Sequence, residues 1–252
     1  NQVKSIIKGG LGQPLTNSQI ALTQGVEMET FSTNGQREIR LEATECIYDQ
    51  KARVAFSPGN MKAESGDGKY TIAGEGFFWR QSDTSFVMSN RVHSTVDSAM
   101  LKSKSARTNQ PDANRLDIFS DHFDYNGKIG LATYDGHLRV TGTNLLLTST
   151  TLKIKRPTAG TNGVESLSAE QNVVFDYEQI HATGEHALYT TASNLVQLFG
   201  NPQWHAGQRE GRAPVRRLAG LLGVDPHDLE RLERPVPQVF EPTAVHARNR
   251  DH

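Results

Sequence analysis

The chain has 252 residues, a formal net charge of −1 and a hydrophobic fraction of 36%. The near balance of charge argues against nucleic acid as a partner, because nucleic-acid-binding domains carry an excess of lysine and arginine. The single cysteine, Cys46, excludes an intrachain disulfide framework and a cysteine-based metal site. Low hydrophobicity with 22 glycines favours a thin, turn-rich β-structure over a compact globule.

The first 19 residues are rich in glycine and contain Pro14 and Asn17, which predicts an extended lead-in that is partly ordered at best. No apolar run reaches the ~20 residues that span a bilayer. The chain begins at Asn1 rather than at a methionine, which leaves room for a leader or membrane anchor that has been removed.

Alternating apolar and polar residues begin at Ile20 and predict β-strands. We expect one turn at 58–60 (Pro-Gly-Asn) and a hairpin turn at 65–68 (Ser-Gly-Asp-Gly). The next hairpin concentrates Phe77, Phe78, Trp79, Phe86 and Met88 around a Gln-Ser-Asp turn. This hairpin is either ordinary core under a turn or an aromatic lining for an acyl or sugar ligand.

The polar segment 98–114 predicts a connecting loop whose basic residues are solvated. Strands resume at Leu116, and Asn-Gly at 126–127 and Asp-Gly at 135–136 indicate turns. We expect further strands over 138–148 and 150–155 and a loop over 156–163.

A recurring frame suggests that the β-structure is built from repeats. A glycine follows a tyrosine after eleven residues three times: Tyr48 and Gly59, Tyr125 and Gly136, Tyr189 and Gly200. The repetition predicts supersecondary units that each end on a turn and bury their apolar faces by stacking on their neighbours.

The composition changes after Trp204, where eight arginines and no lysine occur up to the end of the chain. Residues 214–223 and 226–232 predict short helices, the second with Asp225 as N-cap and Pro226 at the first helical position. The rest is a Pro- and Arg-rich tail, for which a docking role, disorder and an altered chain continuation all stay open.

No catalytic motif is visible. The nine histidines form no metal-binding spacing, so we expect no metal and no cofactor. Asp117 and Asp121 can share one face of a strand and are the sole candidates for acid–base chemistry, although a solvated surface pair is the simpler interpretation. We therefore expect a protein that is not an enzyme.

Three short segments carry a resemblance to a known family. Ala169-Glu170-Gln171-Asn172-Val173, the stretch ATGEHALY at 182–189 and LFGNP at 198–202 are similar to the repeat of the OstA-like family of periplasmic lipopolysaccharide-transport proteins, the bridge proteins of the LptA and LptC type. Gly74, Gly76 and Trp79, followed by Ser89-Asn90 and Val92, resemble the related membrane-anchored bridge component of the same export machine.

The resemblance implies an all-β fold: antiparallel strands forming an open, folded-over β-jellyroll that is solenoid-like, with a short helical or disordered tail. It also implies a periplasmic carrier that shelters the acyl chains of lipopolysaccharide inside the sheet and joins other β-jellyroll export components, or further copies of itself, by edge-strand addition. An inner-membrane anchor in a missing segment is compatible with this location. The residues expected to face inward and bind lipid are Ile72, Phe78, Phe86, Met88, Val92, Leu138, Val140, Leu147, Val173, Phe175, Leu188 and Leu198.

The expected organisation is a lead-in over 1–19, a bridge-like half over 20–97, the loop 98–114, an OstA-like half over 115–207 and the tail 208–252. Two other functions stay open. A structural or adhesive β-solenoid would have a closed core, and a polysaccharide-acting enzyme would need Asp117 and Asp121 for turnover.

Overall fold

The structure is a computed structural model that describes residues 4–32, 34–97, 115–157, 163–193, 195–207, 209–212 and 216–219. Seventeen antiparallel strands in these ranges form one sheet, so the all-β prediction is confirmed. The strands are β1 Lys4–Lys8, β2 Leu11–Pro14, β3 Gln19–Phe31, β4 Arg37–Asp49, β5 Val54–Ser65, β6 Tyr70–Arg80, β7 Ser85–Asp97, β8 Arg115–Ser120, β9 His122–Asn126, β10 Leu131–Gly142, β11 Leu145–Lys155, β12 Ser166–Tyr177, β13 Ile180–Thr190, β14 Leu195–Phe199, β15 Gln203–Ala206, β16 Arg209–Arg212 and β17 Arg216–Ala219.

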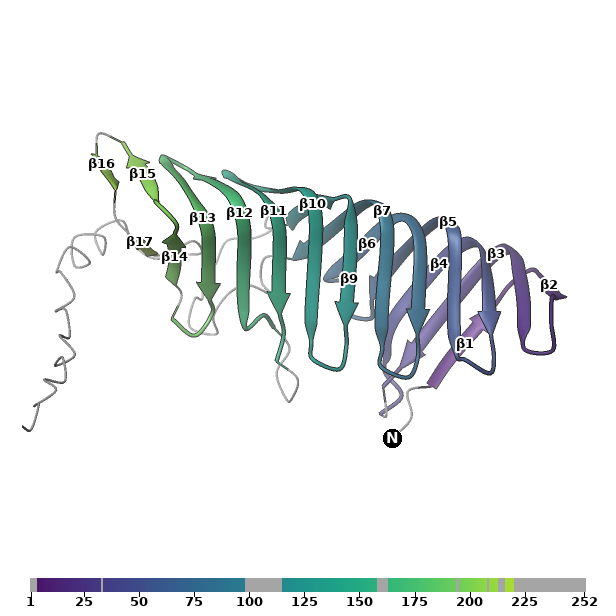
Figure 1. Ribbon diagram of the computed structural model, residues 1–252. Helices are drawn as coiled ribbons and strands as arrows, with labels where there is room; N and C mark the ends of the chain where they lie inside the picture. The colour runs from purple at the N-terminus through teal and green to yellow at the C-terminus, as the bar shows by residue number, and fades with distance from the viewer. Residues whose placement is uncertain are drawn as a thin grey trace, which may run out of the picture.

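Strands pair mainly with their neighbours along the chain, so the sheet is a long meander that extends from β1 and β2 at one end to β14–β17 at the other (Figure 1). In four places two short strands take the position of one long strand: β1 with β2, β8 with β9, β14 with β15, and β16 with β17. The segments 20–97 and 115–207 belong to this same sheet, because β7 pairs directly with β8 and β9.

A line of irregularities folds the sheet over on itself. The register shifts near the middle of the long strands, as between Ser57 and Asn60 in β5 and between Asp135 and Leu138 in β10. Bulges bend a strand and increase its local twist. The result is two facing layers: layer A contains β1, β8, β15, β16 and the strand halves paired with them, and layer B contains β2, β9, β14, β17 and their paired halves.

This fold line corrects the interpretation of the tyrosine–glycine frame. Gly59 and Gly136 lie inside β5 and β10 at the bulges, and Gly200 lies at the break between β14 and β15, so none of them ends a hairpin. The true reversals are the turns between strands, including the expected ones at 65–68 and after Asn126. Similarly, the break expected between 148 and 150 is a bulge in β11, and the turn is at 143–144.

Both ends of the chain depart from the sequence-based expectation where they are described. The lead-in contributes β1 and β2, which pair with the two halves of β3. The helix expected over 214–223 is wrong at Arg216–Ala219, which is strand β17 paired with β14. The helix expected over 226–232, the loop 98–114 and the tail beyond 219 lie outside the described residues. No helix in the described part of the chain is long and apolar enough to cross a bilayer.

Candidate functional site

The space between the two layers is lined by two continuous rows of mostly apolar side chains. Residues directly opposite each other on paired strands share a face of the sheet. In layer A the inner row runs Met28, Leu41, Ala63, Ile72, Ser94, Ile118, Val140, Leu147, Phe175, Ala182 and Trp204. In layer B it runs Phe77, Met88, Phe123, Tyr134, Leu152, Ala169, Ala187 and Leu198.

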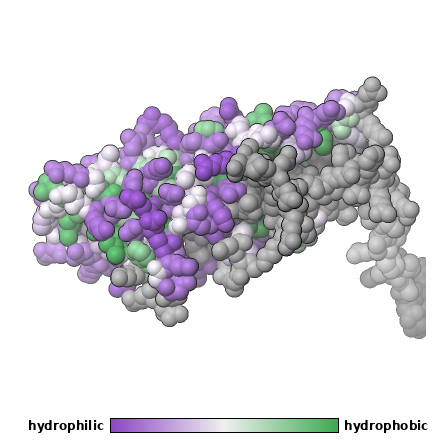
Figure 2. Space-filling model, turned by 180° about the vertical axis from the view of Figure 1, so that it is seen from behind, coloured by the Kyte–Doolittle hydropathy of each residue, from purple (hydrophilic) through white to green (hydrophobic). Residues whose placement is uncertain are grey.

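Most residues expected to face inward lie in this interior. Eight are buried in the core: Ile72, Met88, Val92, Leu138, Val140, Val173, Phe175 and Leu198. Phe86 and Leu147 are partly buried and pack against the same core. The layers pack closely, since Met88 and Leu198 are both fully buried. Among the residues that Figure 2 colours, on the side away from the viewer of Figure 1, most of those at the surface are hydrophilic, and hydrophobic residues occur in small groups.

The expectation is wrong for Phe78 and Leu188, which lie on the outer face. Phe78 stands between the buried Phe77 and Trp79, and its ring lies under the Arg80 guanidinium, 5.5 Å from ring centroid to Cζ. Leu188 pairs with Ser168, whose neighbour Ala169 is buried in the interior. Because side chains alternate between faces, the residues next to inward ones point outward.

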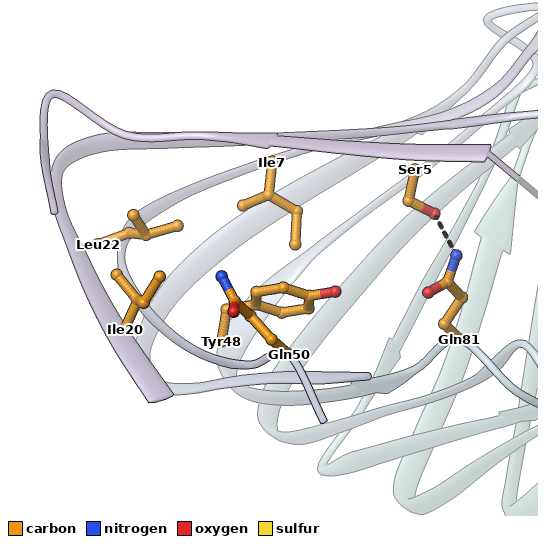
Figure 3. Close-up of a pocket in the computed structure, with 7 residues that line it drawn as sticks. All are labelled: Ser5, Ile7, Ile20, Leu22, Tyr48, Gln50 and Gln81. Carbon is orange, nitrogen blue, oxygen red and sulfur yellow. Dashed lines mark hydrogen bonds between the residues drawn. The ribbon is translucent and has the colours of Figure 1, made fainter. Parts of the chain in front are cut away.

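A cavity of about 240 Å³ lies between the layers at the N-terminal end of the sheet. Its apolar lining includes Ile7 from β1 in layer A and Ile20 and Leu22 from β3 in layer B, with Tyr48 at the end of β4 (Figure 3). Gln81 donates a hydrogen bond from Nε2 to Ser5 Oγ at 3.4 Å, which joins the β6–β7 turn to β1 beside the cavity (Figure 3). Sequence analysis missed this cavity, because β1 belongs to the segment expected to be a loose lead-in.

The interior also contains a polar cluster that the sequence did not indicate. The hydroxyl groups of Tyr70, Ser94 and Tyr134 are mutually hydrogen-bonded, although they come from β6, β7 and β10. Burial raises the pKa of Tyr70, and it raises the pKa of Tyr134 well above the ordinary value of 10.0. Both phenols are therefore neutral at physiological pH.

Asp117 and Asp121 each bind a different histidine on the surface. The Asp117 carboxylate lies 2.8 Å from His93 Nε2 and accepts a hydrogen bond from Thr95 Oγ1 at 3.1 Å. The hydrogen bond with His93 is the main cause of the lowered pKa of Asp117. Asp121 lies at the fold line, 2.6 Å from His137 Nδ1. Each carboxylate thus has its own partner, and the pair does not converge on a common reacting centre.

Two further acidic side chains on the surface bind a basic side chain of a neighbouring strand. Asp176 accepts a hydrogen bond from His181 in the next strand at 2.6 Å, and Glu170 binds Lys153 at 2.8 Å. Within the described ranges, no group of three or more His, Cys, Asp or Glu side chains is arranged to hold a metal ion.

Residues 117–215 match the family model described as "LptA/(LptD N-terminal domain) LPS transport protein". This segment, which is less than half of the chain, is therefore similar to the LptA/LptD N-terminal family. The match begins within β8 and runs through the second half of both inner rows. Strands β1–β7 precede the matched LptA/LptD segment and continue its sheet, because β7 pairs with β8 and β9.

Comparison with solved structures found a similarity to LptH from Pseudomonas aeruginosa, described as the LptA homologous periplasmic component of the conserved lipopolysaccharide transport device. The identity is 20%, the alignment covers 44% of this chain and 82% of that chain, and the TM-score is 0.36. A comparison with curated proteins found no match.

Proposed function

We propose that this chain is a periplasmic lipopolysaccharide-transport component that shelters lipid acyl chains between layers A and B. The observation that carries the proposal is the pair of apolar rows on facing layers, which continue through the segment that matches the LptA/LptD family. Head groups and sugars would stay outside, against the hydrophilic outer surface (Figure 2). The chain would act by binding and guiding lipid, with no bond made or broken.

Burial of hydrocarbon supplies the driving force for this function. Each methylene group removed from water contributes ~0.8 kcal/mol, so a twelve-carbon chain gains roughly 10 kcal/mol before ordering costs. The layers pack closely against each other, so an acyl chain has to part them and replace protein–protein contacts with protein–lipid contacts. The cavity lined by Ile7, Ile20 and Leu22 is where the interior is already open, and we infer that it is the entry point.

The two ends of the sheet provide the contacts for assembly. The sheet ends in the edge strands β1 and β2 at one end and β16 and β17 at the other. Edge strands have unpaired backbone groups that can pair with another strand. We propose that other β-jellyroll export components, or further copies of this chain, add to these edges and extend the apolar interior from one module to the next.

A photo-cross-linking comparison of two neighbouring phenylalanines tests the carrier function. Phe86 packs against the core, whereas Phe78 lies on the outer face under Arg80. With p-benzoylphenylalanine at each position in turn, we expect irradiation with purified lipopolysaccharide to label position 86 in a saturable manner and position 78 at background level. Native mass spectrometry should detect the same complex.

Equal labelling at both positions would indicate adsorption to the surface rather than sheltering of acyl chains. No labelling at position 86, together with an unliganded mass in the presence of lipopolysaccharide, would contradict the carrier function.

A further inference from the structure

Hydroxyl groups interrupt both inner rows at one place. Ser94 is the hydroxyl-bearing member of the layer A row defined above, and Tyr134 is the hydroxyl-bearing member of the layer B row. The two side chains are 0% and 1% exposed, respectively. Tyr134 Oη donates a hydrogen bond to Ser94 Oγ at 3.0 Å, so the polar positions of the two rows face and bind each other across the interior.

Tyr70 completes a closed ring of three hydroxyl groups. Its Oη lies 3.1 Å from Tyr134 Oη and 3.3 Å from Ser94 Oγ. Each hydroxyl can donate one hydrogen bond and accept another, so the ring satisfies all three groups without water. Hydrogen bonds in such a chain polarise and strengthen one another in a low-dielectric interior.

The ring ties the two layers together in the middle of the sheet. Tyr70 and Ser94 belong to the layer A halves of β6 and β7, and Tyr134 belongs to the layer B half of β10. The aromatic ring of Phe123 packs against that of Tyr134, with 4.8 Å between the ring centroids. The N-terminal cavity lies on one side of this closure, and the inner rows from β11 to β15 lie on the other.

We propose that Tyr70, Ser94 and Tyr134 form a hydrogen-bonded latch that divides the interior into two compartments and opens when an acyl chain passes between them. This inference rests on the proposed carrier function. A hydrocarbon chain cannot replace the hydrogen bonds that it displaces, so passage leaves buried hydroxyl groups unsatisfied, which is unfavourable. The latch therefore retards lipid at the junction between the compartments and holds the layers closed in its absence.

The test measures arrival of lipid on each side of the latch. Tyr48 lines the N-terminal cavity, and Tyr177 packs against the core at the end of β12 on the far side. p-Benzoylphenylalanine replaces each of these tyrosines in turn. The rate of cross-linking to purified lipopolysaccharide is followed by rapid mixing and flash irradiation. The rates are compared between the otherwise unaltered chain and Tyr134→Phe, which keeps the aromatic ring and removes the hydroxyl.

We expect Tyr134→Phe to raise the rate of labelling at position 177 about five- to thirtyfold, the range that corresponds to one to two lost hydrogen bonds, because the Tyr134 hydroxyl takes part in two of the three. The rate at position 48 should stay unchanged. Tyr70→Phe should act in the same direction, and it provides the test if Tyr134→Phe does not fold, because Tyr70 is only partly buried. The matched control is Ser149→Ala, which removes a buried hydroxyl that donates to the Thr151 carbonyl oxygen at 3.0 Å and takes no part in the ring, and it should alter neither rate.

Labelling at both positions with equal rates in the parent and both ring variants would overturn the latch while leaving the carrier function intact. Absence of labelling at both positions in every variant would overturn the carrier function, and the latch with it.

Discussion

Individual glycines determine where the sheet folds over. Gly74 lies in β6 at the fold line, where a Cβ would approach the Asn90 carbonyl oxygen to 2.8 Å and press against Met88 Sδ. Gly76, two residues on, has a φ of +69°, in the left-handed region that glycine adopts without strain. The Gly-Glu-Gly motif thus has a physical role in the bend, because no side chain fits between β6 and β7 at position 74.

Gly74→Ala should therefore lower the free energy of unfolding by about 1–3 kcal/mol, the usual cost of overpacking a core. Urea denaturation followed by circular dichroism measures this change. The control is Gly12→Ala in β2, where a Cβ meets only Leu22 Cδ2 at 3.6 Å and Ile20 Cγ2 at 3.8 Å, and the change should stay within ~0.5 kcal/mol. Equal effects at the two sites would show that close approach at position 74 is unimportant.

A second residue-level feature is the ion pair between His137 and Asp121 at the fold line. Both side chains are largely exposed, and the hydrogen bond and charge of Asp121 raise the pKa of His137 above its ordinary value of 6.5. A raised pKa in the folded state means that the contribution of this pair to stability is complete below pH ~6.5. The contribution is lost as the pH rises through the folded-state pKa.

We expect an NMR titration of the His137 ring protons to give a pKa above 6.5, and Asp121→Asn to shift the His137 pKa back down towards that value. Asp135→Asn is the control, since Asp135 also lies beside the fold line but accepts its hydrogen bond from Thr151. A His137 titration that is identical in the parent chain and in Asp121→Asn would contradict the pairing.

At the scale of the element, the β2 edge of the sheet exposes large apolar side chains. Leu11 in β2 and Leu15 just after it are 53% and 49% exposed, among the most exposed large apolar side chains of the described residues. Apolar residues at an unpaired edge favour association, whereas lysine at an edge opposes it. We therefore expect this end of the sheet to take part in assembly.

Replacement of both Leu11 and Leu15 by lysine should weaken self-association, or binding to another β-jellyroll module, by at least about tenfold, since 1.4 kcal/mol corresponds to a factor of ten. Analytical ultracentrifugation over a range of concentrations measures the association constant. Ile129→Lys is the control, because Ile129 is similarly exposed at 44% but lies in the β9–β10 turn, away from both edges. An equal loss in the control would assign the effect to charge alone.

At the scale of the whole molecule, the fold places residues from distant strands in one interior. The Tyr70 and Tyr134 hydroxyls come from positions 64 residues apart in the chain and lie 3.1 Å from each other. The Ser5–Gln81 contact likewise joins residues 76 positions apart beside the N-terminal cavity. An enclosed site can form in such a protein only after the sheet has folded over, since neither layer encloses space by itself.

The sequence alone determined the fold class and most of the inner face. Alternation with period two predicted strands, and it placed residues such as Ile72, Val140 and Phe175 on the face that the structure buries. Alternation did not predict the inner face where apolar residues follow one another. At Phe77-Phe78-Trp79 the pattern does not show which residue points outward. At Ala187-Leu188 we expected Leu188 to face inward, whereas Ala187 does. The motifs at 169–202 were sufficient to indicate the family whose model matches residues 117–215.

Only the tertiary structure showed that the glycines of the tyrosine–glycine frame lie at the fold line, and where the interior contains a cavity and a ring of hydroxyl groups. Glycine occurs both at β-bulges and at hairpin turns, because the backbone bends at both, so the sequence does not distinguish the two positions. Only the pairing of neighbouring strands shows which of them a glycine occupies. The cavity beside Ser5 and the ring of Tyr70, Ser94 and Tyr134 depend on contacts between the layers. Local patterns cannot encode such contacts, since the facing layers bring together residues that are far apart in the chain.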